Sequence, residues 1–164
     1  MSLIFRAVLV FMLALGLASC STKFRTYTGP AVTEIQVHKS ERKMYLLSDG
    51  EVVKSFDVAL GFAPVGPKQF EGDGKTPEGL YYITHKNPKS NFYLSLGISY
   101  PNDQDRANAK AAGKPPGGDI FIHGGPRSPI SQPDWTVGCV AVTDRQMEEV
   151  YAMVKPGTPI WLLP

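Results

Sequence analysis

A histidine and a cysteine that could act together lie a short loop apart in the second half of this 164-residue chain. His123 is followed by Gly124 and Gly125, and Cys139 is preceded by Gly138. A cysteine attacks as its thiolate, and a histidine one hydrogen bond away supplies the base or the positive charge that it needs. Neighbouring glycines allow close approach of a substrate and leave backbone N–H groups available for an oxyanion. The pattern therefore predicts that Cys139 is a nucleophile and that His123 is its base.

Both residues lie where a loop meets a short apolar run. The run 119–122 ends at His123, and the run 139–142 begins at Cys139, so pairing of these two segments would bring the side chains together. Other apolar or alternating segments between turn residues predict further strands at 34–38, 42–48, 52–60, 79–84, 92–99 and 160–163. These short strands predict a single mainly β domain, a sandwich or barrel, with one or two small helices.

One of those helices has a clear beginning. Thr143 is a predicted N-cap, and Gln146 completes a capping box three residues later. The apolar residues that follow at helical spacing form one face: Met147, Val150, Tyr151 and Val154. Residues 103–112 predict a second, polar helix that ends at Gly113.

The charge balance argues against a nucleic-acid partner. The chain has 17 Lys and Arg against 15 Asp and Glu, a formal net charge of +2, with no clustered basic stripe. Four lysines lie in loops before the His–Cys region: Lys68, Lys75, Lys86 and Lys89. They could form a basic rim that attracts an anionic polymer, but we expect them to be solvated loop charges.

The N-terminal segment predicts export. Arg6 precedes an apolar run over 7–17, which is short for a membrane span and typical of a signal peptide. Leu17-Ala18-Ser19-Cys20 then resembles the bacterial lipoprotein signal, in which the cysteine is lipidated and becomes the new N-terminus. We therefore expect a signal peptide over 1–19, a lipidated Cys20 with a tether over 20–31, and a folded domain over 32–164. Such a protein is periplasmic and lipid-anchored, at the outer membrane if the source is a diderm bacterium.

The cysteine count supports a function for Cys139. The chain has two cysteines, and a lipidated Cys20 leaves Cys139 without a disulfide partner in an oxidising compartment. A buried structural cysteine and a Cys20–Cys139 disulfide are the alternatives. A zinc site needs three or four ligands, and His38 and His85 lie in unrelated strands. We expect neither a metal nor another cofactor.

Three motifs together resemble the L,D-transpeptidase family of peptidoglycan-modifying enzymes. They are His123-Gly124, then Thr136-Val137-Gly138-Cys139, and upstream Thr76-Pro77-Glu78-Gly79 before a predicted strand. The similarity runs from about residue 33 to the C-terminus. It implies the fold of that family, and a reaction in which Cys139 forms a thioester with a peptidoglycan stem peptide and passes it to an amine or to water.

The resemblance also implies roles for several neighbours. The backbone carbonyl of Gly124 would orient His123, and backbone N–H groups near Gly138 and Cys139 would form the oxyanion hole. Thr136 and Gly125 would belong to the same substrate-binding region.

The sequence departs from the family pattern at two positions beside the nucleophile. Ala141 replaces an arginine that many members carry, and Val137 replaces a basic residue or histidine. Arg127 could supply the missing positive charge, although a solvated loop arginine is the alternative. These departures leave open hydrolysis, by an L,D-carboxypeptidase or by a peptidase or amidase that releases wall-linked lipoprotein. A non-catalytic wall-binding lipoprotein is the further alternative, and the intact His, Gly and Cys argue against it.

Overall fold

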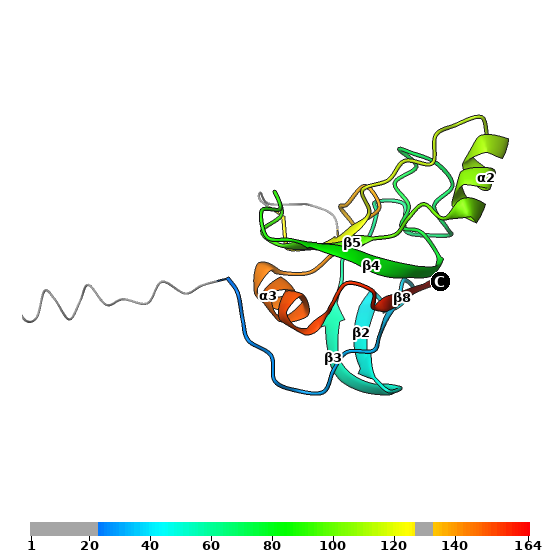
Figure 1. Cartoon of the computed structure of the whole chain (residues 1–164). Coiled ribbons are helices and arrows are strands. Elements are labelled where there is room, and N and C mark those ends of the chain that lie inside the picture. Colours follow the sequence, from blue (N-terminus) through cyan, green and yellow to red (C-terminus); the bar gives the residue numbers. More distant parts are fainter. Residues whose placement is uncertain (1–22, 127–132) are drawn as a thin grey trace, which may run out of the picture.

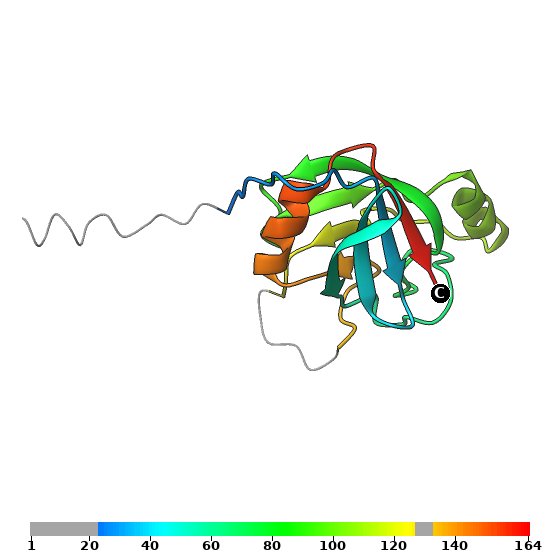
Figure 2. The same ribbon diagram turned by 90° about the horizontal axis from the view of Figure 1, so that it is seen from below.

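The computed structural model describes residues 23–126 and 133–164. This part of the chain forms a single curled sheet of eight strands with two helices (Figures 1 and 2). The strands are β1 (Glu34–His38), β2 (Lys43–Ser48), β3 (Glu51–Asp57), β4 (Gly79–Asn87), β5 (Ser95–Ile98), β6 (Phe121–His123), β7 (Val140–Ala141) and β8 (Pro159–Leu163). The helices are α2 (Asp103–Ala111) and α3 (Asp144–Met153). The mainly β prediction is confirmed.

The strand order in the sheet is β3-β2-β1-β8-β4-β5-β6-β7. The pairs β1–β8 and β6–β7 are parallel, and the other neighbouring pairs are antiparallel. The twist of this sheet curls it into a half-barrel whose two edges are β3 and β7 (Figure 2).

The segment that follows β3 brings the two edges of the sheet together. Ala59 forms an antiparallel bridge with Ala141 of β7, and Gly61 forms a parallel bridge with Thr136. Two backbone hydrogen bonds connect Ala59 and Ala141, at 2.8 and 2.9 Å. The segment containing the candidate nucleophile is therefore paired on both sides, with β6 on one side and residues 59–61 on the other.

Alternation of side chains places the core inside the curl. In β1, Ile35 and Val37 are fully buried, whereas their neighbours are partly exposed, as expected for a strand with one face in the core. All four residues of β5 are buried because this strand lies inside the sheet and contacts α3. The predicted strands at 52–60 and 92–99 are shorter in the structure, since loops leave the sheet at Asp57 and enter it at Ser95.

The predicted capping boxes explain where the helices begin. Thr143 caps α3 by accepting a hydrogen bond from the Gln146 backbone, and the Gln146 side chain accepts one from the Thr143 backbone. Met147 and Val150 bury the inner face of α3. In α2, Asn102 and Asp105 form the same arrangement, and Asp105 also accepts a hydrogen bond from the Tyr81 hydroxyl that attaches α2 to β4.

Part of the predicted tether contacts the folded domain. Arg25 forms an ion pair with Glu148 of α3 at 2.6 Å, and Lys23 donates hydrogen bonds to the carbonyl oxygens of Pro88 and Tyr93. These contacts attach residues 23–25 of the predicted tether to α3 and to the β4–β5 connection. Within the described residues, no helix is both long enough and apolar enough to cross a membrane.

Candidate active site

The parallel pairing of β6 with β7 brings the histidine and the cysteine onto one surface. Ile122 lies opposite Val140 and His123 opposite Ala141, so Cys139 is displaced from His123 by two positions along the neighbouring strand. Such diagonal neighbours are within reach of each other's side chains. Both line a cavity of about 460 Å³, together with Asn87, Ser90, Asn91, Phe92, Ser95, Asp119 and Phe121.

The His123 ring is buried and held in one orientation. Its Nδ1 lies 2.7 Å from the carbonyl oxygen of Gly124. Because a carbonyl oxygen only accepts hydrogen bonds, Nδ1 carries the proton and Nε2 is the nitrogen that can act as a base. The Phe92 ring lies 4.5 Å from the imidazole, and the Trp135 ring meets it edge-on at 5.5 Å. Two aromatic rings and one hydrogen bond therefore limit rotation of the imidazole.

The Cys139 thiol is partly exposed at the cavity wall. Its S–H donates to the backbone carbonyl of Asp119, with 3.4 Å between sulfur and oxygen. Burial raises the pKa of this thiol most strongly, and the negative charge of Asp119 also raises it. A hydrogen bond from the backbone N–H of Phe121 and the positive charge of Lys68 lower the pKa. The net effect on the pKa of Cys139 is upward, so these surroundings favour the thiol over the thiolate. If this cysteine attacks a substrate, it needs a base to form the thiolate.

Thr136 holds the turn that carries the cysteine. Its hydroxyl accepts a hydrogen bond from the Gly138 N–H at 3.1 Å and donates one to the Cys139 carbonyl at 2.8 Å. Gly138 has a φ of +136°, a conformation that residues with a side chain rarely adopt. The Gly138 N–H is thus engaged, whereas the Cys139 N–H makes no hydrogen bond to any residue that the structure describes. Of the two N–H groups expected in the oxyanion hole, that of Cys139 is the available donor.

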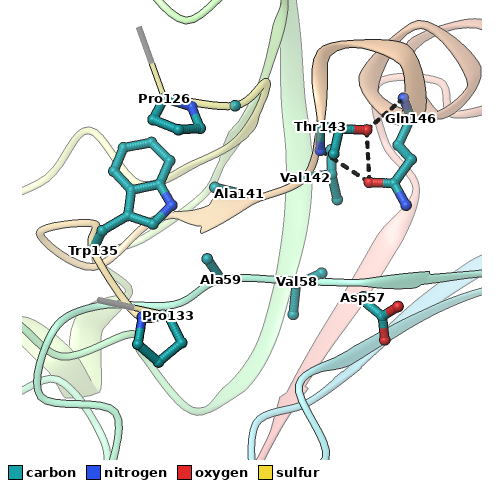
Figure 3. A pocket seen from close by; sticks show the side chains of 11 residues that line it. Asp57, Val58, Ala59, Pro126, Pro133, Trp135, Ala141, Val142, Thr143 and Gln146 are labelled. Atoms are coloured by element: carbon teal, nitrogen blue, oxygen red, sulfur yellow. Dashed lines mark hydrogen bonds between the residues drawn. The ribbon is translucent and has the colours of Figure 1, made fainter. Parts of the chain in front are cut away.

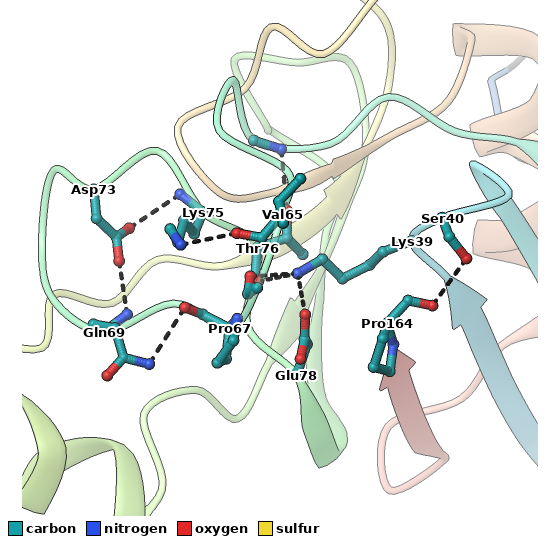
Figure 4. Close-up of polar contacts among 12 residues, drawn as sticks. Lys39, Ser40, Val65, Pro67, Gln69, Asp73, Lys75, Thr76, Glu78 and Pro164 are labelled. Carbon is teal, nitrogen blue, oxygen red and sulfur yellow. Dashed lines mark hydrogen bonds and ion pairs between the residues drawn. The ribbon is translucent and has the colours of Figure 1, made fainter.

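A loop over 58–78 contacts this turn, since Gly61 forms a bridge with Thr136. A buried lysine anchors the loop (Figure 4). Lys39 is 2% exposed, and it donates to the carbonyl oxygens of Gly66 and Thr76 and pairs with Glu78 at 2.7 Å. Desolvation by burial lowers the pKa of Lys39, and the partner Glu78 opposes this effect. The Thr76 hydroxyl in turn accepts the N–H of Gly61 at 3.0 Å. The Thr-Pro-x-Gly motif therefore helps to fix the loop that packs against the turn carrying Cys139.

The prediction that the loop lysines are all solvated is wrong for Lys68. Lys68 is 4% exposed and pairs with Asp73 at 2.9 Å. Asp73 also accepts the backbone N–H groups of Gln69, Phe70 and Lys75, which lowers its pKa against the opposing effect of burial. The pairing places a fixed positive charge close enough to lower the Cys139 pKa.

Trp135 lines a second cavity of about 400 Å³, together with Ala59, Pro126 and Pro133 (Figure 3). It contains the Gly125 and Ala141 positions, so these residues are separated from the cavity that holds Cys139. The Gly125 N–H donates to the Asp144 carboxylate at 3.1 Å. Arg127 lies outside the described residues. In the described part of the chain, no group of three His, Cys, Asp or Glu side chains could hold a metal ion.

The cavity also contains residues that the sequence analysis did not select. Asp119 has a left-handed backbone with a φ of +54°, and Phe92 packs on the histidine although it comes from a different segment. Their apolar or turn-like sequence context gave no signal for a site, because their roles depend on the β5–β6 pairing.

Sequence and fold place the chain in one class of protein. Residues 33–162 match the family of L,D-transpeptidase catalytic domains, YkuD. The chain therefore belongs to this family, and the resemblance in the sequence is confirmed.

Individual relatives agree with this placement. YafK of Escherichia coli (strain K12), whose name assigns it to the L,D-transpeptidases, is 32% identical over 126 residues, covering 73% of this chain and 46% of YafK. The helical cell shape determining protein Pgp2 of Campylobacter jejuni superposes with a TM-score of 0.63 at 25% identity, over 90% of this chain and 53% of Pgp2. Bd1075 of Bdellovibrio bacteriovorus superposes with a TM-score of 0.58 at 27% identity, over 80% of this chain and 47% of Bd1075. The chain thus spans about half the length of these relatives.

Proposed function

We propose that this protein is a lipid-anchored cysteine enzyme of the L,D-transpeptidase type that acts on peptidoglycan stem peptides. The observation that carries the proposal is the shared cavity of His123 and Cys139, in which the Gly124 carbonyl leaves Nε2 of the histidine as the base. A buried, oriented imidazole beside a thiol is a suitable arrangement for acyl transfer.

The proposed reaction has two steps. In the first, Nε2 of His123 takes the thiol proton, Sγ of Cys139 bonds to the stem-peptide carbonyl, and the amide C–N bond breaks as the terminal D-residue leaves with that proton. The Cys139 N–H stabilises the oxyanion. In the second, an amine or water loses a proton to His123 and attacks the thioester, and the thiol is regenerated.

The experiment is incubation of the full chain with purified muropeptides, followed by mass analysis of the products. We expect a thioester adduct on the wild type and none on Cys139→Ala, which removes only a partly exposed sulfur and should fold normally. Cys139→Ser should be nearly as inactive, because a neutral alcohol is a much weaker nucleophile than a thiolate. Muropeptide turnover by Cys139→Ala would falsify the nucleophile assignment.

Hydrolysis is the second candidate outcome for the acyl-enzyme, as in an L,D-carboxypeptidase or a peptidase that frees wall-linked lipoprotein. Val137, beside the nucleophile, is 65% exposed and apolar, and Ala141 is 3% exposed. Neither can hold an acceptor amine by a polar contact, and positioning gives an acceptor much of its advantage over water. We expect cleaved stems to equal or exceed crosslinked dimers when donor and acceptor are supplied together; dimers with negligible cleaved stems would reject this expectation.

A further inference from the structure

Among the described residues that line the cavity at Cys139, one side chain is acidic and the others are mostly neutral polar or aromatic. Four of its lining residues carry amides or hydroxyls, namely Asn87, Ser90, Asn91 and Ser95. Phe92 and Phe121 contribute aromatic surface. Apart from the titratable histidine and thiol, the carboxylate of Asp119 is the charged group among the described residues of this wall.

Asp119 is fixed next to the nucleophile by its backbone. Its carbonyl oxygen accepts the Cys139 S–H, and its φ of +54° places it in a tight left-handed turn directly before Ile120. The residue is exposed, and its carboxylate forms no ion pair or hydrogen bond with any part of the chain that the structure describes. Within the described residues, no partner therefore competes with a ligand for this charge.

An unpaired negative charge at this point works against formation of a thiolate. Asp119 raises the pKa of Cys139, and the buried Lys68 only partly offsets burial and Asp119 together. A cation that pairs with Asp119 would remove this opposition during the step that needs the thiolate. Stem peptides with a diamino acid carry such a cation close to the carbonyl that the thiol attacks.

We propose that Asp119 is a specificity residue of the catalytic cavity, whose carboxylate binds the side-chain ammonium group of a diamino acid in the stem peptide. This inference rests on the proposed function, because it concerns the substrate of the same site. The ammonium can belong to the acyl donor or to the acceptor, and the chemistry of recognition is the same in both.

Binding is measured by calorimetry on Cys139→Ala, which cannot turn substrate over. The probes are a synthetic donor tetrapeptide that carries a diamino acid before its terminal D-residue, an acceptor tripeptide that ends in the diamino acid, and both peptides with the side-chain amine acetylated. We expect acetylation to weaken binding of at least one peptide about tenfold, and Asp119→Asn to abolish this difference. If Asp119→Asn removes the effect of acetylation on binding of the donor peptide, the ammonium belongs to the donor. If it removes the effect on binding of the acceptor peptide, the ammonium belongs to the acceptor.

Asp119→Asn is a suitable variant because asparagine also tolerates a left-handed turn, so only the charge changes. Asp49 provides the matched control, since it is an exposed aspartate with a φ of +49° in the β2–β3 hairpin, outside the cavity lining. Asp49→Asn should leave the effect of acetylation intact. The inference is overturned if free and acetylated peptides bind equally well to the chain with Asp119. It is also overturned if the preference for the free amine persists in Asp119→Asn.

Turnover of the same donor by the chain that retains Cys139 is measured separately. Turnover without amine discrimination rejects the role of Asp119 and leaves the proposed function intact. Amine-dependent binding without turnover supports Asp119 as the binding residue and rejects the proposed reaction.

Discussion

The carbonyl oxygen of Lys75 lies 2.7 Å from the point where a Cβ atom on Gly138 would be placed. Real side chains do not approach a backbone oxygen this closely, and Gly138 also has a φ of +136°. The loop over 58–78 and the turn that carries Cys139 are therefore packed together at a position that requires glycine.

Gly138→Ala should consequently displace the turn and the Cys139 N–H. We expect about a 100-fold loss of acyl-enzyme formation, the range found when an oxyanion donor is removed, and a loss of about 1–3 kcal/mol of stability from backbone strain. Single-turnover mass analysis and urea unfolding measure the two effects. Gly118→Ala is the control, because its Cβ would meet no atom within 4 Å. Equal activity of the two variants would show that the packing does not position the nucleophile.

Lys39 anchors the same loop from the side of β1. Lys39→Met keeps the length of the side chain and leaves Glu78 and two carbonyl oxygens without their donor. We expect a loss of about 3 kcal/mol, typical of breaking a buried ion pair, with a lower rate of acyl-enzyme formation. The measurement is urea unfolding together with a turnover assay.

Lys43→Met serves as the control for Lys39→Met, because the Lys43–Asp57 pair is exposed and such pairs contribute little. If both lysine variants unfold at the same urea concentration, the buried pair does not stabilise the loop.

The sequence predicted the strands, both helices and the placement of His123 and Cys139 at loop–strand junctions. Local signals were sufficient there, since capping boxes and alternation are properties of short segments. The environment of the two residues was not predictable in this way. Lys68 resembles a solvated loop lysine in sequence, and its burial against Asp73 depends on how the 58–78 loop folds. The hydrogen bond from Gly138 to Thr136 likewise depends on a turn conformation that the residue types permit without specifying.

The lipid anchor at Cys20 is a prediction of the sequence that cell fractionation can test. Wild type should partition with membranes and incorporate labelled fatty acid, whereas Cys20→Ala should do neither, because several acyl chains give an anchor of about 0.8 kcal/mol per buried CH₂. Cys139→Ala is the matched control and should behave as the wild type. Equal membrane partition of all three, with no labelled fatty acid on any, would reject the lipoprotein interpretation.

The last prediction concerns the pH at which Cys139 reacts. Only the thiolate is alkylated, so the rate of reaction with iodoacetamide rises with pH until the thiol is fully ionised. Burial and the Asp119 charge raise the pKa of Cys139, so the midpoint should lie above about 8.5, the value of an unperturbed thiol. Asp119→Asn removes a negative charge that disfavours the thiolate, and the midpoint should therefore move to lower pH. Asp49→Asn, with the same change in an exposed turn, should leave it in place. A midpoint below that of free cysteine in the wild type would instead indicate a thiolate–imidazolium pair already formed in the resting enzyme, with His123 as its cation and not as the base that acts during attack.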